Sequence, residues 1–124
     1  MFDFKKRIKR LQKLLEKKNI GNLLIASGVE VNPNVLYYSG DATSPIILWI
    51  TRDEAKYYGS KEHDWFDSCQ ELEAYRKEFK KLTRKKIAVD EKANGALAFR
   101  LQKKNNVKPF WAELMKLREV KDQQ

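Results

Sequence analysis

The only histidine, His63, lies close in sequence to two carboxylates and a thiol, which are residue types that can bind a metal ion. These neighbours are Asp64, Asp67 and Cys69. A dinuclear hydrolase site needs several carboxylates that hold both cations and share a bridging nucleophile, and this spacing does not match one. We therefore interpret the segment as a solvated polar loop, and we expect no metal or cofactor site in this chain.

Cys69 could act as a nucleophile if a neighbouring His63 lowered the pKa of its thiol. Such a pair also needs a third residue that orients the base, and the sequence supplies no candidate. The same objection applies to a serine triad built on Ser60 or Ser68. We interpret Cys69 as a passive thiol near the start of a helix, and we predict no catalytic residue.

Two adjacent carboxylates, Asp90 and Glu91, follow a short apolar run, where α/β proteins often keep functional groups. They could supply acid and base chemistry. Asp is also a favoured N-cap, because its side chain accepts hydrogen bonds from the first amides of a helix. We interpret Asp90 as the cap of a helix that starts near Ala93.

Four aromatic residues remain as candidates for contact with a substrate or a partner. If the stretch around Tyr37 and Tyr38 is extended, the two side chains point to opposite faces, so that one enters the core. We expect both to stabilise a sheet. Trp65 and Phe66 lie in the polar loop, and we expect them to be exposed contact residues for a partner subunit or another domain.

The elements that must position these residues fit one domain, because 124 residues with 42% hydrophobic side chains can bury a core. No apolar run is long enough to span a bilayer. The single cysteine cannot form an intramolecular disulfide. We therefore expect a soluble, cytoplasmic protein with no membrane contact.

The first half of the chain predicts a helix, a buried strand and a hairpin. In the helix, over residues 4–18, apolar side chains recur at steps of three and four, Asp3 is a suitable N-cap and Gly21 a suitable stop. The apolar run at residues 22–27 predicts a strand buried on both faces. Two further apolar runs, at 45–50 and 55–58, flank four polar residues and predict a hairpin.

The second half alternates helix and strand. We predict a loop over residues 59–70, and then Leu72, Tyr75, Phe79 and Leu82 mark one face of a helix. A strand over 86–90, a helix over 93–105 and a strand over 107–111 follow. The alternation predicts parallel strand pairs beside the antiparallel hairpin, and hence an α/β fold with a mixed central sheet flanked by helices.

Three segments, in this order, resemble the N-terminal domain of the creatinase, prolidase and aminopeptidase P family. The first runs from Arg7 to Ile25 with the shape R-x3-L-x2-L-L…G-x-L-L-I. The second is Asn34-Val-Leu-Tyr-Tyr-Ser-Gly40, similar to the family's Asn-x-x-Tyr-Leu-Thr-Gly-Phe signature. The third, Leu117-Arg-Glu-Val-Lys-Asp122, is similar to the segment that opens the catalytic domain. Together they cover essentially the whole chain.

The resemblance implies a mixed sheet with a ribonuclease H-like motif over residues 1–117. Residues 118–124 would begin a linker helix to a catalytic domain that this chain does not contain. In the family, that domain is a hydrolase that cleaves proline-containing peptides with two divalent metal ions, expected to be Mn, Co or Zn. The ions are held by two Asp, one His and two Glu residues of that domain.

The resemblance further implies that this N-terminal domain performs no chemistry, helps to form a homodimer and restricts access to the active site of a Xaa-Pro dipeptidase or aminopeptidase. Two residues depart from the signature: Ser39 stands in place of Thr, and Asp41 stands in place of an aromatic residue. The candidate substrate-access or subunit-contact residues are Tyr37, Tyr38, Asp41, Trp65 and Phe66.

The net charge of +9 supports an alternative, a stand-alone basic module that binds nucleic acid or another acidic partner. Residues 1–18 carry eight basic and two acidic residues, so the excess is local. The candidate contacts are Lys5, Lys6, Lys9, Lys13, Lys80, Lys81, Lys85 and Lys86. We favour solvated helix faces, because exposed aromatic residues for base stacking are not interleaved with these lysines.

Overall fold

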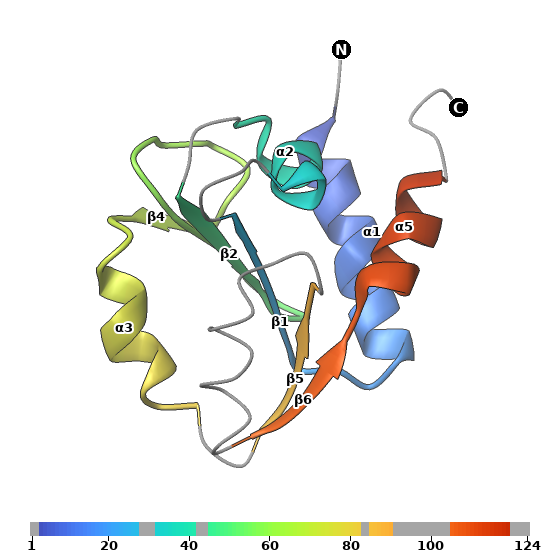
Figure 1. Cartoon of the computed structure of the whole chain (residues 1–124). Coiled ribbons are helices and arrows are strands. Elements are labelled where there is room, and N and C mark those ends of the chain that lie inside the picture. Colours follow the sequence, from blue (N-terminus) through green and yellow to red (C-terminus); the bar gives the residue numbers. More distant parts are fainter. Residues whose placement is uncertain (1–2, 28–31, 42–44, 83–84, 91–104, 120–124) are drawn as a thin grey trace.

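A six-stranded mixed sheet forms the centre of the computed structural model, which describes residues 3–27, 32–41, 45–82, 85–90 and 105–119 (Figure 1). The strand order is β4-β3-β2-β1-β5-β6. The strands are β1 (Asn22–Ser27), β2 (Ile46–Ile50), β3 (Ala55–Tyr58), β4 (Ser68–Gln70), β5 (Lys86–Val89) and β6 (Asn106–Pro109). The described helices are α1 (Phe4–Lys17), α2 (Pro33–Ser39), α3 (Ala74–Phe79) and α5 (Trp111–Glu119).

The predicted mixture of strand directions is confirmed. β2 is antiparallel to both β1 and β3, and Thr51–Glu54 form the predicted hairpin connection, in which the Thr51 amide donates to the Glu54 carbonyl. β5 is parallel to β1, and β6 is parallel to β5. The predicted strand at residues 107–111 begins one residue earlier and ends at Pro109. The predicted helix at 93–105 lies outside the described residues.

The sheet separates two cores. α1, α2 and α5 cover one face, where Leu11 and Leu15 of α1 pack with Leu23 and Leu48 of the sheet (Figure 1). α3 covers the opposite face, where its Phe79 joins a second apolar cluster. Full burial of one leucine contributes roughly 1.5–3 kcal/mol, so each buried leucine of these clusters stabilises the sheet by that order.

The first helix begins where the sequence predicts and ends earlier. Asp3 is its N-cap, and one carboxylate oxygen accepts a hydrogen bond of 3.0 Å from the Lys6 amide. The helix ends at Lys17, and Asn19 takes the left-handed conformation with φ of 57°. Asn tolerates this conformation better than most residues, so the chain turns two residues before the predicted stop at Gly21.

The segment around Tyr37 and Tyr38 is helical, which corrects its interpretation as extended sheet. Asn32 caps α2 through its side chain, and Pro33 occupies the first turn, where its missing amide costs nothing. Gly40 ends the helix with φ of 68°. These start and stop signals outweigh the preference of tyrosine for strands.

Two further corrections concern the ends of predicted loops and helices. Residues 68–70, predicted as part of a loop, form β4, a short edge strand parallel to β3. α5 begins at Trp111, within the predicted last strand, and its Leu114 is fully buried in the core. The first turns of α5 are therefore packed against the domain.

Candidate functional site

The candidate site is a corner where the end of α2 meets the loop between β3 and β4. The Trp65 indole Nε1 donates a hydrogen bond of 3.1 Å to the Tyr38 carbonyl, which joins the loop to the helix. The His63 and Trp65 rings lie with centroids 4.7 Å apart. We call this set of side chains the aromatic corner: Tyr38, Asp41, Tyr57, His63, Trp65 and Phe66.

Asp41 is the polar centre of the aromatic corner, and its side chain is fully buried. The Tyr57 hydroxyl donates to Asp41 Oδ2 at 2.7 Å, and His63 Nε2 lies 3.4 Å from the same oxygen. The ammonium of Lys61 approaches the other carboxylate oxygen to 3.9 Å. A buried carboxylate is costly unless it is hydrogen-bonded or paired, so these contacts explain how an aspartate can occupy this position.

The two tyrosines of the corner are held in their neutral form. Burial, and secondly the hydrogen bond to Asp41, raise the pKa of Tyr57 well above its ordinary range. Burial, and secondly the neighbouring Tyr37, raise the pKa of Tyr38. Both hydroxyls therefore stay protonated above about pH 10, where an ordinary tyrosine ionises, and Tyr57 acts as a hydrogen-bond donor that fixes Asp41.

The expectation that Trp65 and Phe66 are exposed needs correction. Phe66 is 7% exposed and belongs to the apolar core, with its ring centroid 5.5 Å from that of Tyr57. Trp65 is half-buried, and its ring stacks on Phe4 at a centroid distance of 4.6 Å. The prediction rested on the polar residues around them in the sequence, which are typical of an exposed loop. In the structure the loop folds back over the sheet, so that it buries Phe66 and half-buries Trp65.

Gly40 allows the close approach that seals this corner. Its left-handed φ of 68° disfavours other residues, and a Cβ placed there would lie 2.7 Å from Cζ of Phe4. The Phe4 ring therefore packs directly against the backbone of Gly40. The glycine of the family signature is therefore needed here because it ends α2 and leaves room for the Phe4 ring.

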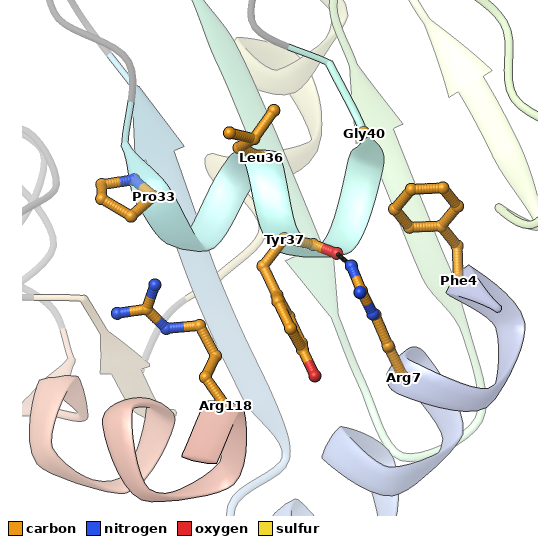
Figure 2. Close-up of a pocket in the computed structure, with 7 residues that line it drawn as sticks. All are labelled: Phe4, Arg7, Pro33, Leu36, Tyr37, Gly40 and Arg118. Carbon is orange, nitrogen blue, oxygen red and sulfur yellow. Dashed lines mark hydrogen bonds between the residues drawn. The ribbon is translucent and has the colours of Figure 1, made fainter. Parts of the chain in front are cut away.

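Tyr37 borders the aromatic corner, because its ring meets that of Tyr38 edge-on with the two centroids 4.9 Å apart. Its half-buried ring lines a pocket between α1, α2 and α5 (Figure 2). Arg7, 5% exposed, donates from Nη1 to the Tyr37 carbonyl at 2.6 Å and places its guanidinium 3.9 Å from the ring centroid of Tyr37. The structure therefore brings Tyr38, Asp41, Trp65 and Phe66 together, and Tyr37 joins them at the edge through its ring contact with Tyr38.

The groups that could have formed a thiol or metal site make other contacts. The sulfur of Cys69 accepts from the His63 amide at 3.3 Å, whereas the His63 ring faces Asp41. Asp67 accepts from the Ala55 amide at 2.7 Å and so fixes the start of β3. Within the described ranges, no group of three or more His, Cys, Asp or Glu side chains could hold a metal ion.

Asp90 connects the end of β5 to the start of α2. Its buried carboxylate accepts a hydrogen bond of 3.1 Å from the Asn32 side-chain amide and a second from that of Asn34. The helix that Asp90 is predicted to cap lies outside the described residues. Asp90 is therefore a structural acceptor that positions α2, and with it the aromatic corner.

The candidate nucleic-acid contacts do not share one surface. Lys5, Lys6, Lys9 and Lys13 are exposed on α1, on one side of the sheet, whereas Lys80 and Lys81 follow α3 on the other side (Figure 1). A nucleic-acid groove needs adjacent phosphate contacts. The arrangement therefore divides these lysines between opposite faces.

Sequence reasoning missed Tyr57, Phe4 and the pairing of His63 with Asp41. The alternation in β3 was a usable signal for Tyr57, because it places this residue on the same face of the sheet as α1 and α2. The contact between residues 41 and 63 had no such signal, since it depends on how the loop closes.

Comparison with family models finds a match to the Creatinase/Prolidase N-terminal domain over residues 7–120. A comparison with curated protein sequences finds no match. In the part of the chain that is described, no helix has the length and apolar character needed to cross a membrane.

Solved structures share the fold. Prolidase from Thermococcus sibiricus superposes with a TM-score of 0.77 at 19% identity, over 98% of this chain and 38% of that chain. Prolidase from Pyrococcus horikoshii OT3 gives 0.73 at 19% identity, over 95% and 36%. The aminopeptidase P, Xaa-Pro aminopeptidase, from Streptococcus thermophilus gives 0.70 at 18% identity, over 93% and 98%. This chain therefore spans little more than a third of either prolidase.

Proposed function

Because the chain belongs to the creatinase/prolidase N-terminal domain family, we propose that it is the non-catalytic N-terminal domain of a metal-dependent Xaa-Pro dipeptidase or aminopeptidase. The observation that carries this proposal is the superposition of 98% of the chain on 38% of a prolidase. The proposed role is to support subunit association and to restrict access to an active site built by a following domain.

The chemistry of the described residues supports a role without catalysis. The candidate base and nucleophile of the loop both make structural contacts: His63 with Asp41, and Cys69 with the backbone of His63. The two divalent ions, Mn, Co or Zn, would bind in the following domain, as the family membership suggests. The single thiol, Cys69, suits a cytoplasmic enzyme.

The aromatic corner suits a contact surface held in a fixed shape. Asp41, Tyr57 and Tyr38 are buried and fix the loop, while Trp65 and the adjoining Tyr37 are half-buried and present part of their rings at the surface. Aromatic residues with low conformational freedom are favoured in the centre of protein interfaces. We assign subunit or substrate-access contacts to Trp65 and Tyr37, and a supporting role to Asp41, Tyr38 and Phe66.

Two measurements test this proposal. Sequencing the reading frame beyond Gln124 should find a downstream domain with two Asp, one His and two Glu residues spaced as metal ligands. Light scattering on the complete translation product should give the mass of a homodimer. A complete product that lacks the metal-ligand set, or that is monomeric at micromolar concentration, would contradict the corresponding part of the proposal.

A further inference from the structure

A pocket of about 540 Å³ opens between α1, α2 and α5, beside the aromatic corner, because Phe4, which stacks on Trp65, also lines it (Figure 2). Pockets that bind small molecules have volumes of about 300–1,000 Å³ and are mostly apolar with a few polar groups. The lining residues are Phe4, Arg7, Pro33, Leu36, Tyr37, Gly40 and Arg118. The size and the composition of the lining both match a small-molecule site.

Apolar side chains form the body of this pocket. Phe4, Pro33 and the ring of Tyr37 contribute surface from α1 and α2, and Leu36 is 43% exposed at the rim. Leu36 is one of two large hydrophobic residues that are exposed in the described parts of the chain. Covering this surface with an apolar or aromatic ligand would remove it from water.

Both charged side chains among the described lining residues are arginines. Arg7 is a fixed charge in the wall, because the Tyr37 carbonyl accepts from it and the rings of Tyr37 and Phe4 lie 3.9 Å and 5.2 Å from its Cζ. Arg118 enters from α5, and Figure 2 shows the Tyr37 ring between the two guanidinium groups. Two positive charges beside apolar surface favour a ligand that carries a negative charge.

We propose that this pocket binds a small carboxylic acid with a flat apolar body, with the carboxylate at Arg118 and the body against Leu36 and Tyr37. A planar guanidinium matches a carboxylate with two parallel hydrogen bonds, and the carboxylate would replace the weak acceptor, the Met115 sulfur, that lies 2.9 Å from Nη2 of Arg118. Tyr37 is shared with the proposed subunit or substrate-access surface, so the tests below change Arg118 and Leu36 and use the 124-residue chain alone.

Isothermal titration of the 124-residue chain with 2-naphthoate tests this proposal. We expect saturable binding with one site per chain, at least tenfold weaker binding of the neutral 2-naphthamide, and no detectable binding of acetate, which lacks the apolar body. Equal affinity for 2-naphthoate and 2-naphthamide, or no binding of 2-naphthoate at millimolar concentration, would overturn the proposal.

Variants separate a specific site from general attraction to a basic protein. Arg118→Gln should weaken 2-naphthoate binding about tenfold, as expected for the loss of one charged hydrogen-bond donor. Lys13→Gln removes the same charge from the exposed face of α1, outside the pocket, and should leave the affinity unchanged. An equal loss in both variants would show attraction to net charge alone and would contradict the site.

Leu36→Asp gives a second test at an exposed position, so the result does not depend on the folding of the Arg118 variant alone. It should abolish binding of 2-naphthoate while the far-UV circular dichroism stays unchanged, and retained binding would contradict the pocket. The dipeptide Ala-Phe supplies an apolar carboxylate from a peptide. Tighter binding of Ala-Phe than of 2-naphthoate would contradict a free small acid as the ligand.

Discussion

The hydroxyl of Tyr57 donates a hydrogen bond of 2.7 Å to the carboxylate of Asp41, and both side chains are buried. Tyr57 belongs to β3, and Asp41 directly follows the glycine that ends α2. This bond therefore fixes the end of the helix to the sheet. His63 approaches the same carboxylate oxygen from the loop between β3 and β4. The aromatic corner thus depends on one aspartate with partners from two elements.

Asp41→Ala should destabilise the chain by about 2–3 kcal/mol, because it leaves the buried hydroxyl of Tyr57 without its acceptor and creates a small cavity. Urea unfolding followed by circular dichroism measures this change. Asp53→Ala, in the exposed hairpin turn, is the matched control and should change the unfolding free energy by less than about 0.5 kcal/mol. A loss in Asp41→Ala no larger than in the control would contradict a structural role for this carboxylate.

Gly40→Ala should cost more than about 2 kcal/mol, since it combines a left-handed φ of 68° with a Cβ only 2.7 Å from the ring of Phe4. Gly21→Ala is the control, because nothing lies within 4 Å of the added Cβ. That substitution should be neutral or slightly stabilising through the unfolded state. Equal shifts of the thermal midpoints of Gly40→Ala and Gly21→Ala would contradict the packing of the Phe4 ring against Gly40.

Stability should fall as the pH rises above about 10, the ordinary pKa of tyrosine. The folded-state pKa values of Tyr38 and Tyr57 are raised, so above pH 10 the unfolded state releases protons that the native state retains. Each tyrosine then lowers the free energy of unfolding by up to about 1.4 kcal/mol per pH unit. Urea titrations between pH 8 and 11 should show this slope.

Tyr57→Phe should reduce that slope by the contribution of one proton, while leaving the fold intact. A slope identical to that of the unmodified chain would show that Tyr57 titrates normally in the folded state.

The elements were predictable from the sequence more readily than the corner that they build. The apolar runs at β1, β2 and β3 and the spacing in α1 give the mixed sheet, because burial acts on local patterns. α2 was missed as a helix because its sequence, Pro-Asn-Val-Leu-Tyr-Tyr-Ser, has few strong helix formers and is stabilised by its caps and by tertiary packing.

The contacts that define the candidate site could not be read from local patterns. The loop that contains Trp65 and Phe66 is rich in charge, yet Phe66 is buried because the loop returns to pair β4 with β3. The bond between Asp41 and Tyr57 joins residues that are 16 apart in the chain. Such contacts depend on loop closure, on which the hydrophobic periodicity carries no information.

A gel shift with duplex DNA and single-stranded RNA tests the alternative function. Because the exposed lysines of α1 and those after α3 lie on opposite faces of the sheet, we expect no appreciable binding at about 150 mM salt. Submicromolar affinity that falls steeply with added salt would instead support a basic binding module.

The most direct test of the proposed function is a Xaa-Pro cleavage assay on two proteins side by side, the 124-residue chain and the complete translation product, each with Mn²⁺, Co²⁺ or Zn²⁺. We expect the complete product to hydrolyse Xaa-Pro substrates with one of these metals and to lose activity with a chelator, while the 124-residue chain shows none. Metal-dependent cleavage by the 124-residue chain alone, at a rate comparable to that of the complete product, would contradict a non-catalytic N-terminal domain.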